Sequence, residues 1–273
     1  MYDLHLSPEQ LEFRDTVRDF VENEIKPVAL HPDRLEPFEK PLLIDLVDKA
    51  AQMGLRTLAL SEEAGGAGAD VLTSCIVLEE LAAGDIDIAA VLGRTSFLGH
   101  VLFDQLLSAE QRSRFLPDFA QDDRCHLGFA GREPDAGLGW SYHRLPTADG
   151  GAELSAKKQG SDWVINGALP FVANAPVAKL FLAQVRTDPK KTGANGISTL
   201  LVAHDAAGLT VGKPPKATGE AIRWYQGTGA SVTFKDCRVP AGQLVGKEGQ
   251  SPLADGTMLA RSATQMKSEA KRS

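Results

Sequence analysis

The stretch that decides the fold begins at Leu127 and reads LGFAGREPDAGLGW through Trp140. After an insert it closes with SDWVINGALPFVANA over residues 161–175. In the first half, a short apolar run is followed by Glu133-Pro134-Asp135-Ala136-Gly137. Proline presets one backbone dihedral and glycine supplies the unusual one, so this order predicts a strand that feeds a tight turn.

The second half of the stretch alternates between apolar and polar residues around an Asn-Gly pair. Trp163 to Gly167 is expected to form a strand that ends in a turn at Asn166-Gly167, and Ala168 to Asn174 is expected to return beside it. Asn-Gly between apolar runs is the strongest short-range sign of a β-hairpin. We therefore predict a hairpin here.

These two halves resemble the acyl-CoA dehydrogenase family. The middle domain of that family carries a Thr-Glu-Pro-x-Ala-Gly-Ser-Asp turn and, after an Ile-Asn-Gly hairpin, a Trp-x-Thr-Asn segment against the flavin. Here the matching segments are Arg132 to Gly139 and Phe171 to Asn174, in the same order and at similar spacing. The resemblance implies a helical domain followed by a β domain.

Composition excludes several classes of protein. The chain has 273 residues, and its 43% hydrophobic content is ample for a core. Its net charge of −7 is unfavourable for general nucleic-acid binding. Its three cysteines lie far apart, so neither a disulfide framework nor a zinc site is indicated, and a reduced, cytoplasmic location is expected. No apolar run approaches the ~18 residues of a membrane span. The first ten residues lack the basic character of a signal peptide.

The N-terminal part shows helical periodicity. Ser7-Pro8-Glu9-Gln10 is a helix start with a capping box, and Pro27 is expected to end or kink that first helix. The same period predicts further helices at about 42–53, 71–83 and 88–107, and a last one that Ser108 caps and that ends near Phe119. We assign residues 1–123 to an all-helical domain.

From about Arg124 the period becomes that of strands. Short apolar and β-branched runs separated by Gly, Pro, Asn and Asp are typical of a small antiparallel sandwich or barrel, which we assign to residues 124–243. The predicted strands are 180–185, 197–202, 209–211 and 230–234. Residues 244–273 are interpreted as the start of a C-terminal helical domain. The fold class is therefore α+β.

The resemblance also implies a chemistry. Members of the family oxidise an acyl-CoA thioester to its 2,3-enoyl form with FAD as hydride acceptor, while a Glu removes the proton next to the carbonyl. The family's C-terminal helical domain supplies that Glu, the second wall of the flavin site and much of the self-association. Expected partners are acyl-CoA, other subunits in a homo- or hetero-oligomer, and an electron-transfer flavoprotein.

Motif matching transfers site residues one by one. Phe129, Gly131 and Gly137 match positions that face the flavin, whereas Arg132 stands where the family has Thr. Leu138 replaces a Ser, and it is also expected to take part in substrate binding. Arginine at position 132 is suited either to an anionic group or to an ion pair with a nearby carboxylate.

Three further positions depart from the family. Phe171 replaces Trp and keeps a stacking face without the indole N–H, and Ala173 replaces Thr. Leu138 and Ala173 cannot donate hydrogen bonds, so two contacts to the flavin are lost, each of about 1 kcal/mol. Ala260, before Arg261, best matches the catalytic Glu of some members, and the sequence offers no replacement base.

Three functions stay open at this point. The chain is part of an acyl-CoA dehydrogenase-like flavoenzyme, a non-catalytic partner subunit of a heteromeric acyl-CoA dehydrogenase, or a flavin-dependent monooxygenase of the same fold. Fold alone does not separate them.

Overall fold

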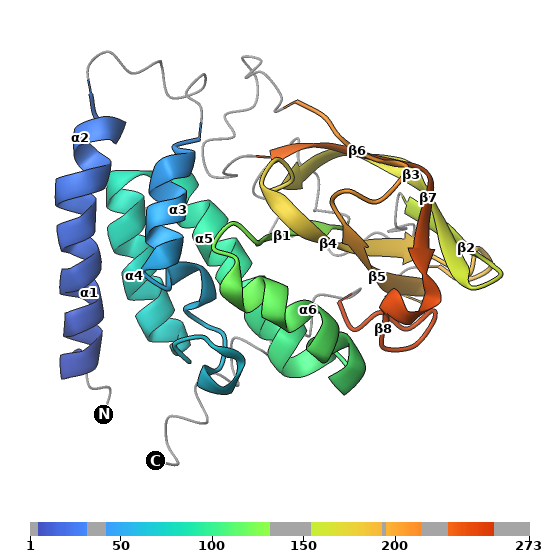
Figure 1. Cartoon of the computed structure of the whole chain (residues 1–273), viewed down its shortest axis with the longest axis horizontal. Coiled ribbons are helices and arrows are strands. Elements are labelled where there is room, and N and C mark those ends of the chain that lie inside the picture. The colour runs from blue at the N-terminus through green and yellow to red at the C-terminus, as the bar shows by residue number, and fades with distance from the viewer. Residues whose placement is uncertain (1–4, 32–41, 132–153, 193–194, 214–228, 254–273) are drawn as a thin grey trace.

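The computed structural model describes residues 5–31, 42–131, 154–192, 195–213 and 229–253. Helices gather at one end and strands at the other, with the fifth and sixth helices lying against the sheet (Figure 1). The α+β class and the order of helices before strands are confirmed. The division at residues 123 and 243 stays a prediction.

The first helix begins as its sequence indicates. α1 (Pro8–Phe20) follows a capping box between Ser7 and Gln10. The chain then stays helical through the π-helical segment η1 (Val21–Ile25) and α2 (Lys26–Ala29), so Pro27 does not end the helix. The irregularity precedes the proline instead: the Lys26 N–H bonds the carbonyl of Val21, five residues back. Pro27 sits in the first turn of α2, where its missing N–H costs little.

The remaining helices lie close to their predicted positions. Ser108 and Gln111 form a second capping box, and Asp70 and Asp85 cap two other helices. The elements are α3 (Ile44–Gln52), the 3₁₀ turns η2 (Leu55–Thr57) and η3 (Glu62–Ala64), α4 (Val71–Gly84), α5 (Ile86–Gly99), the π-helical η4 (His100–Leu106) and α6 (Ala109–Gln121).

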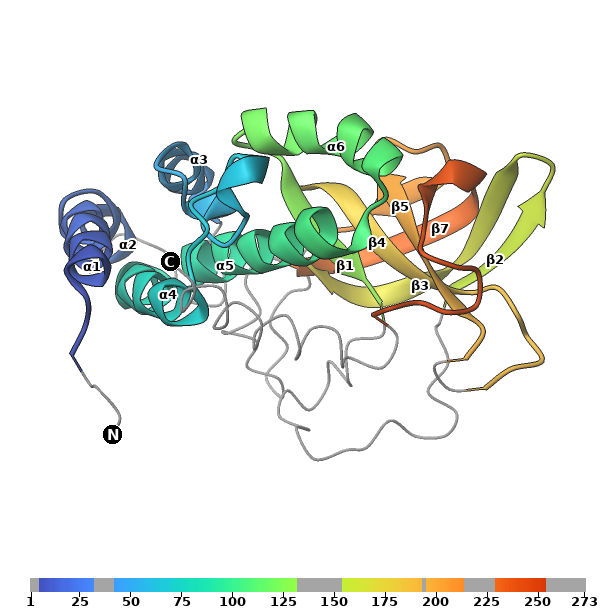
Figure 2. The ribbon, with the colours of Figure 1, turned by 90° about the horizontal axis from the view of Figure 1, so that it is seen from below.

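The helix formed by α5 and η4 corrects an expectation about membrane spans. It covers 21 residues, Ile86–Leu106, and is long and apolar enough to cross a membrane by length and composition. However, 61% of its most apolar window is buried inside the structure. Figure 2 shows α5 between the other helices and the sheet, which is the position of a core helix.

Within the described ranges, eight strands form one sheet, ordered β6-β7-β3-β2-β4-β5-β8, with β1 paired to β4. β1 and β2 both pair in parallel with β4, at different ends of it, and the other pairings are antiparallel. The sheet is therefore mixed rather than purely antiparallel, and the ladder of described strands does not close into a barrel. The strands are β1 (His126–Ala130), β2 (Leu154–Gln159), β3 (Asp162–Ala173), β4 (Ala178–Arg186), β5 (Ile197–Ala203), β6 (Leu209–Val211), β7 (Gly229–Pro240) and β8 (Leu244–Val245), with a 3₁₀ turn η5 (Ala241–Gln243) before β8.

The predicted hairpin at Asn166-Gly167 is wrong. β3 runs through this pair without turning, and the tight turn is at Gly160 (φ 62°), between β2 and β3. Asn166 instead faces a bulge in β7: its Nδ2 donates to Oδ1 of Asp236 at 3.1 Å, and the Asp236 N–H donates to its Oδ1 at 2.9 Å. A partner 70 residues away satisfies the polar groups that a local turn would have used.

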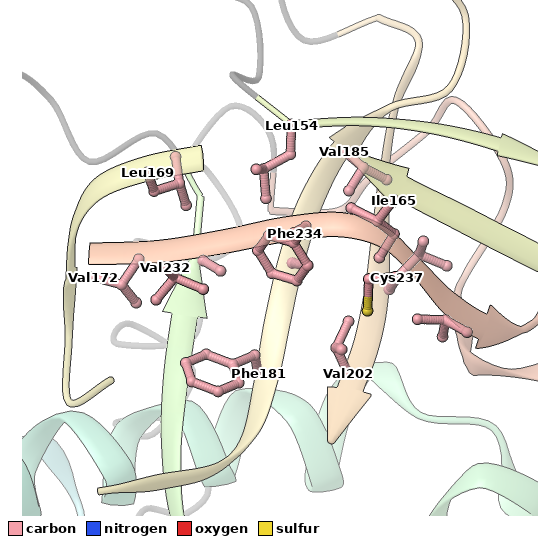
Figure 3. Packing of buried hydrophobic residues seen from close by; sticks show 14 of the residues in the cluster. Leu154, Ile165, Leu169, Val172, Phe181, Val185, Val202, Val232, Phe234 and Cys237 are labelled. Carbon is pink, nitrogen blue, oxygen red and sulfur yellow. The ribbon is translucent and has the colours of Figure 1, made fainter. Parts of the chain in front are cut away.

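Two apolar clusters fix the sheet in place. One lies inside the curve of the sheet and includes Phe181, Val185, Val232 and Phe234 (Figure 3). The other joins the opposite face of β1, β4 and β5 to α5, η4 and α6. Because the second cluster spans helices and strands, the end of β1 is held against the helical part of the chain.

Candidate functional site

The end of β1 presents an aromatic ring over bare backbone. Phe129 is half-buried and packs against the cluster between helices and sheet, and buried Gly131 follows the strand. A Cβ built on Gly131 would lie 2.5 Å from Cε1 of Phe129. The ring therefore occupies the space that any side chain at position 131 would need.

A polar side chain borders the same spot. Gln184 of β4 is only 6% exposed, and its Oε1 lies 3.0 Å from the Cβ position of Gly131. Its Nε2 is buried and has no hydrogen-bond partner in the part of the chain that the structure describes. Ala130 pairs with Ala183, so the residues that follow, Gly131 and Gln184, are neighbours at the same end of two parallel strands.

Phe171 and Ala173 lie near the end of β3 and are 4% and 1% exposed. Neither belongs to the cluster that the adjacent Leu169 and Val172 join inside the sheet. A Cβ on Gly229, which pairs with Ala173, would lie 2.1 Å from Cζ of Phe171. As at Gly131, an aromatic ring here lies against a glycine backbone. Strands β1 and β3 approach each other, with Cα atoms within 8 Å.

A buried polar cluster joins the helices to the strands behind this site. His126 opens β1 and is 1% exposed, with Nδ1 3.3 Å from Oγ1 of Thr95 in α5. Asn174 donates from Nδ2 to the carbonyls of Val91 at 3.2 Å and Leu127 at 3.3 Å. Burial, with Arg56 nearby, lowers the pKa of His126 to about 4, so the imidazole is neutral at pH 7.

Arg56 is a second buried polar group at this seam, and the sequence did not single it out. It is 1% exposed, its guanidinium carbon lies 4.6 Å from the centre of the Phe119 ring, and Nη1 donates to the carbonyl of Cys125 at 3.2 Å. Burial lowers its pKa and raises the pKa of the Cys125 thiol to about 11. The Cys125 thiol is therefore protonated at pH 7.

A cavity of about 200 Å³ lies apart from these residues, between α4 and α5. Its walls are apolar, and they include Leu55, Leu78, Leu81 and Phe97. Ser74 lines it, with a buried hydroxyl that has no partner among the described residues. None of the residues predicted to bind flavin contributes to this cavity.

Comparison with known proteins identifies the two parts of the chain. The model of the acyl-CoA dehydrogenase N-terminal domain matches residues 7–123, and the model of the acyl-CoA dehydrogenase middle domain matches residues 144–237. This chain belongs to the acyl-CoA dehydrogenase family. The resemblance predicted from the sequence is therefore confirmed.

Individual relatives agree with this assignment. A short-chain specific acyl-CoA dehydrogenase of Clostridium acetobutylicum is 33% identical over 94% of this chain and 63% of its own length. The mitochondrial isobutyryl-CoA dehydrogenase of Dictyostelium discoideum is 31% identical over 90% of this chain and 54% of its own length. The structure of butyryl-CoA dehydrogenase from Megasphaera elsdenii shares the fold, with a TM-score of 0.77, 24% identity and coverage of 97% of this chain and 65% of that one. The chain thus spans between about half and two thirds of the length of these acyl-CoA dehydrogenases.

Within this family framework the structure describes four of the predicted site residues, on two strands that approach each other, and their roles stay predictions. Phe129 and Gly131 at the end of β1, and Phe171 and Ala173 near the end of β3, lie on elements that approach each other. The other positions lie outside the described residues, so their roles stay predictions: Arg132, Gly137, Leu138 and Ala260.

The described residues fit a flavin ring. A flat aromatic face at Phe129, which packs over Gly131, and a buried amide donor at Gln184 suit a planar heterocycle with acceptor atoms on its edge. Gln184 was missed because the resemblance offers no match for it. An amide within the otherwise apolar strand Leu180–Val185 was the available signal.

Proposed function

We propose that this chain is the flavin-facing part of an FAD-dependent acyl-CoA dehydrogenase. The observation that carries the proposal is the end of β1, where Phe129 covers the bare backbone of Gly131 beside the amide of Gln184. Membership in the family supports the same conclusion. FAD, when bound, supplies hydride acceptance, and the chain binds and orients it.

Each described residue has a physical task in this proposal. Phe129 and Phe171 provide apolar faces, and Gly131, which has no side chain, leaves room for the Phe129 ring to lie against the backbone. The buried surroundings of β1 exclude water from this side of the ring. Ala173, with a methyl group, packs without donating a hydrogen bond.

The proton-abstracting base of the proposed reaction does not come from the site residues described above. His126 is neutral and fully enclosed, and Ala260, at the position that matches the family's Glu, has no titratable group. We infer that a carboxylate outside the two family-matched domains removes the proton. The acyl-CoA substrate and an electron-transfer flavoprotein as acceptor belong to the same proposal.

Ala173 favours a second candidate, a non-catalytic partner subunit. The residue is 1% exposed, so its methyl group stands at a site where the family's Thr would offer a hydroxyl. Loss of this contact weakens flavin binding by about 1 kcal/mol and leaves the packing of β3 intact. A subunit kept for assembly would tolerate that loss.

A flavin spectrum followed by a substrate titration separates the candidates. The purified chain is mixed with FAD, excess FAD is removed, and the visible spectrum is recorded. If the chain is part of a dehydrogenase, we expect a retained flavin band. Butyryl-CoA or longer acyl-CoAs are then added anaerobically, with and without a full-length relative. If the chain belongs to a dehydrogenase, the flavin band should bleach. A colourless chain that co-purifies with a full-length relative supports the partner subunit instead. Oxygen-dependent hydroxylation without acyl-CoA bleaching would support the monooxygenase.

A further inference from the structure

We propose that Gln184 is an additional cofactor-binding residue, whose Nε2 donates a hydrogen bond to an acceptor atom on the edge of the flavin ring. The proposal rests on the flavin site proposed above and adds a residue that the resemblance does not supply. Gln184 is 6% exposed, and its Nε2 is buried without a partner in the described ranges.

Gln184 points away from the interior of the sheet. Its neighbours Ala183 and Val185 both join the cluster inside the sheet, and side chains alternate along a strand. Gln184 is therefore on the face of Leu182, which lies toward η4 and α6. This is also the face on which Phe129 packs, so the amide and the ring share one side of β1 and β4.

Neighbouring polar groups do not use the amide nitrogen. Thr199 of β5 stands opposite Gln184, but its Oγ1 is bonded to Oγ of Ser251 at 2.6 Å. The Ser251 Oγ in turn accepts from the N–H of Leu253 at 3.2 Å. A buried donor without an acceptor is destabilising, so the described residues give no structural reason for an amide nitrogen at this position.

The chemistry of the spot selects its ligand. Phe129 offers a flat apolar face that rests against Gly131, and Gln184 adds one donor at its border. An isoalloxazine ring presents a planar surface with carbonyl oxygens and ring nitrogens that accept hydrogen bonds. These acceptors gain negative charge on reduction, so a donated hydrogen bond binds the reduced ring more tightly and raises its potential.

The test compares Gln184→Leu with the wild type and with Gln52→Leu, a control at an exposed position in α3. Three quantities are measured: the Kd for FAD from flavin fluorescence, the flavin reduction potential, and the urea midpoint of the chain without FAD. For Gln184→Leu we expect an approximately tenfold weaker Kd and a more negative potential. We expect its midpoint without FAD to equal or exceed that of the wild type. Gln52→Leu should match the wild type in all three.

Each other outcome has a distinct meaning. If the wild type and Gln184→Leu bind FAD equally well, Gln184 is not a ligand and the inference is overturned while the proposed function stands. If Gln184→Leu lowers the midpoint without FAD, the amide supports the fold, and the inference is overturned in favour of a structural role. If the wild type binds no FAD, the proposed function and the inference fall together.

Discussion

The side chain of Gln111 joins the last helix to the end of the β region: its Nε2 donates to the carbonyl of Leu244 at 2.8 Å. The same nitrogen donates to the carbonyl of Gly242 at 2.9 Å. Its Oε1 accepts from the N–H of Ser108 at 3.3 Å and completes the capping box of α6. The side chain of Gln111, a residue that is 8% exposed, thus links the start of α6 to β8.

Replacing Gln111 with leucine should destabilise the chain by about 2 kcal/mol, because two carbonyls lose their donor and the capping box loses the bond from the Ser108 N–H to the Gln111 side chain. Gln10→Leu is the matched control, since Gln10 completes the capping box of α1 without bonds to a distant strand. That control should cost about 0.5–1 kcal/mol. Urea unfolding measures both. Equal losses would show that the bonds to Gly242 and Leu244 contribute nothing beyond the cap.

The burial of His126 makes stability depend on pH. Its pKa is about 4 in the folded chain and 6.5 is the ordinary value, so the unfolded chain binds more protons between these two pH values. The free energy of unfolding should therefore fall as the pH drops from about 6.5 to 4, by about 3 kcal/mol in total. Unfolding midpoints measured across this range test the prediction.

A comparison of two histidine variants isolates this effect. His126→Gln should flatten the decline between pH 6.5 and 4, at the cost of a lower stability at pH 7. His204→Gln, at an exposed position after β5, should leave the decline as it is in the wild type. An unchanged slope in His126→Gln would assign the acid sensitivity to other groups.

Asn174 combines a left-handed backbone with bonds to two elements, α5 and β1. Its φ is 63°, and Nδ2 reaches the carbonyls of Val91 and Leu127 and the hydroxyl of Thr95. Asn174→Gly keeps the backbone conformation and should lose about 1–3 kcal/mol from the missing bonds. Asn174→Ala should lose about 1 kcal/mol more, because a Cβ penalises this conformation. Thermal and urea unfolding that rank the two variants equally would rule out backbone strain at this position.

Short sequence patterns predicted the structural features that depend on residues close together in the chain. The capping box at Ser7 and the helix cap at Ser108 were predicted from a few consecutive letters and are confirmed, because both partners lie within one turn. The Asn166-Gly167 turn failed because Asp236 competes for the same polar groups from a strand far along the chain. Long-range pairing of this kind leaves no trace in the local pattern.

For the candidate site, too, the sequence identified residues through local motifs and missed those whose roles depend on distant neighbours. Phe129 and Phe171 were found through matching motifs, and the structure places them on adjoining elements. Gln184 was not found, and outside the site the bonds of Gln111 to Gly242 and Leu244 were missed as well, because both depend on which groups surround the side chain in three dimensions. In the sequence, Gln184 is recognisable only as a polar residue inside an apolar strand. Gln111 is recognisable only as the Gln of a capping box.

Gly229→Ala tests whether the position of the Phe171 ring matters for flavin binding. A Cβ at position 229 would lie 2.1 Å from Cζ of Phe171, so the ring must move away from the strand. If Phe171 forms part of the flavin site, FAD binding should weaken about tenfold, an effect of ~1.4 kcal/mol. Gly242→Ala is the control, because a Cβ there meets no atom within 4 Å. Flavin fluorescence titration measures both variants; a Gly229→Ala chain that binds FAD as tightly as the control would remove Phe171 from the site, whatever its effect on folding.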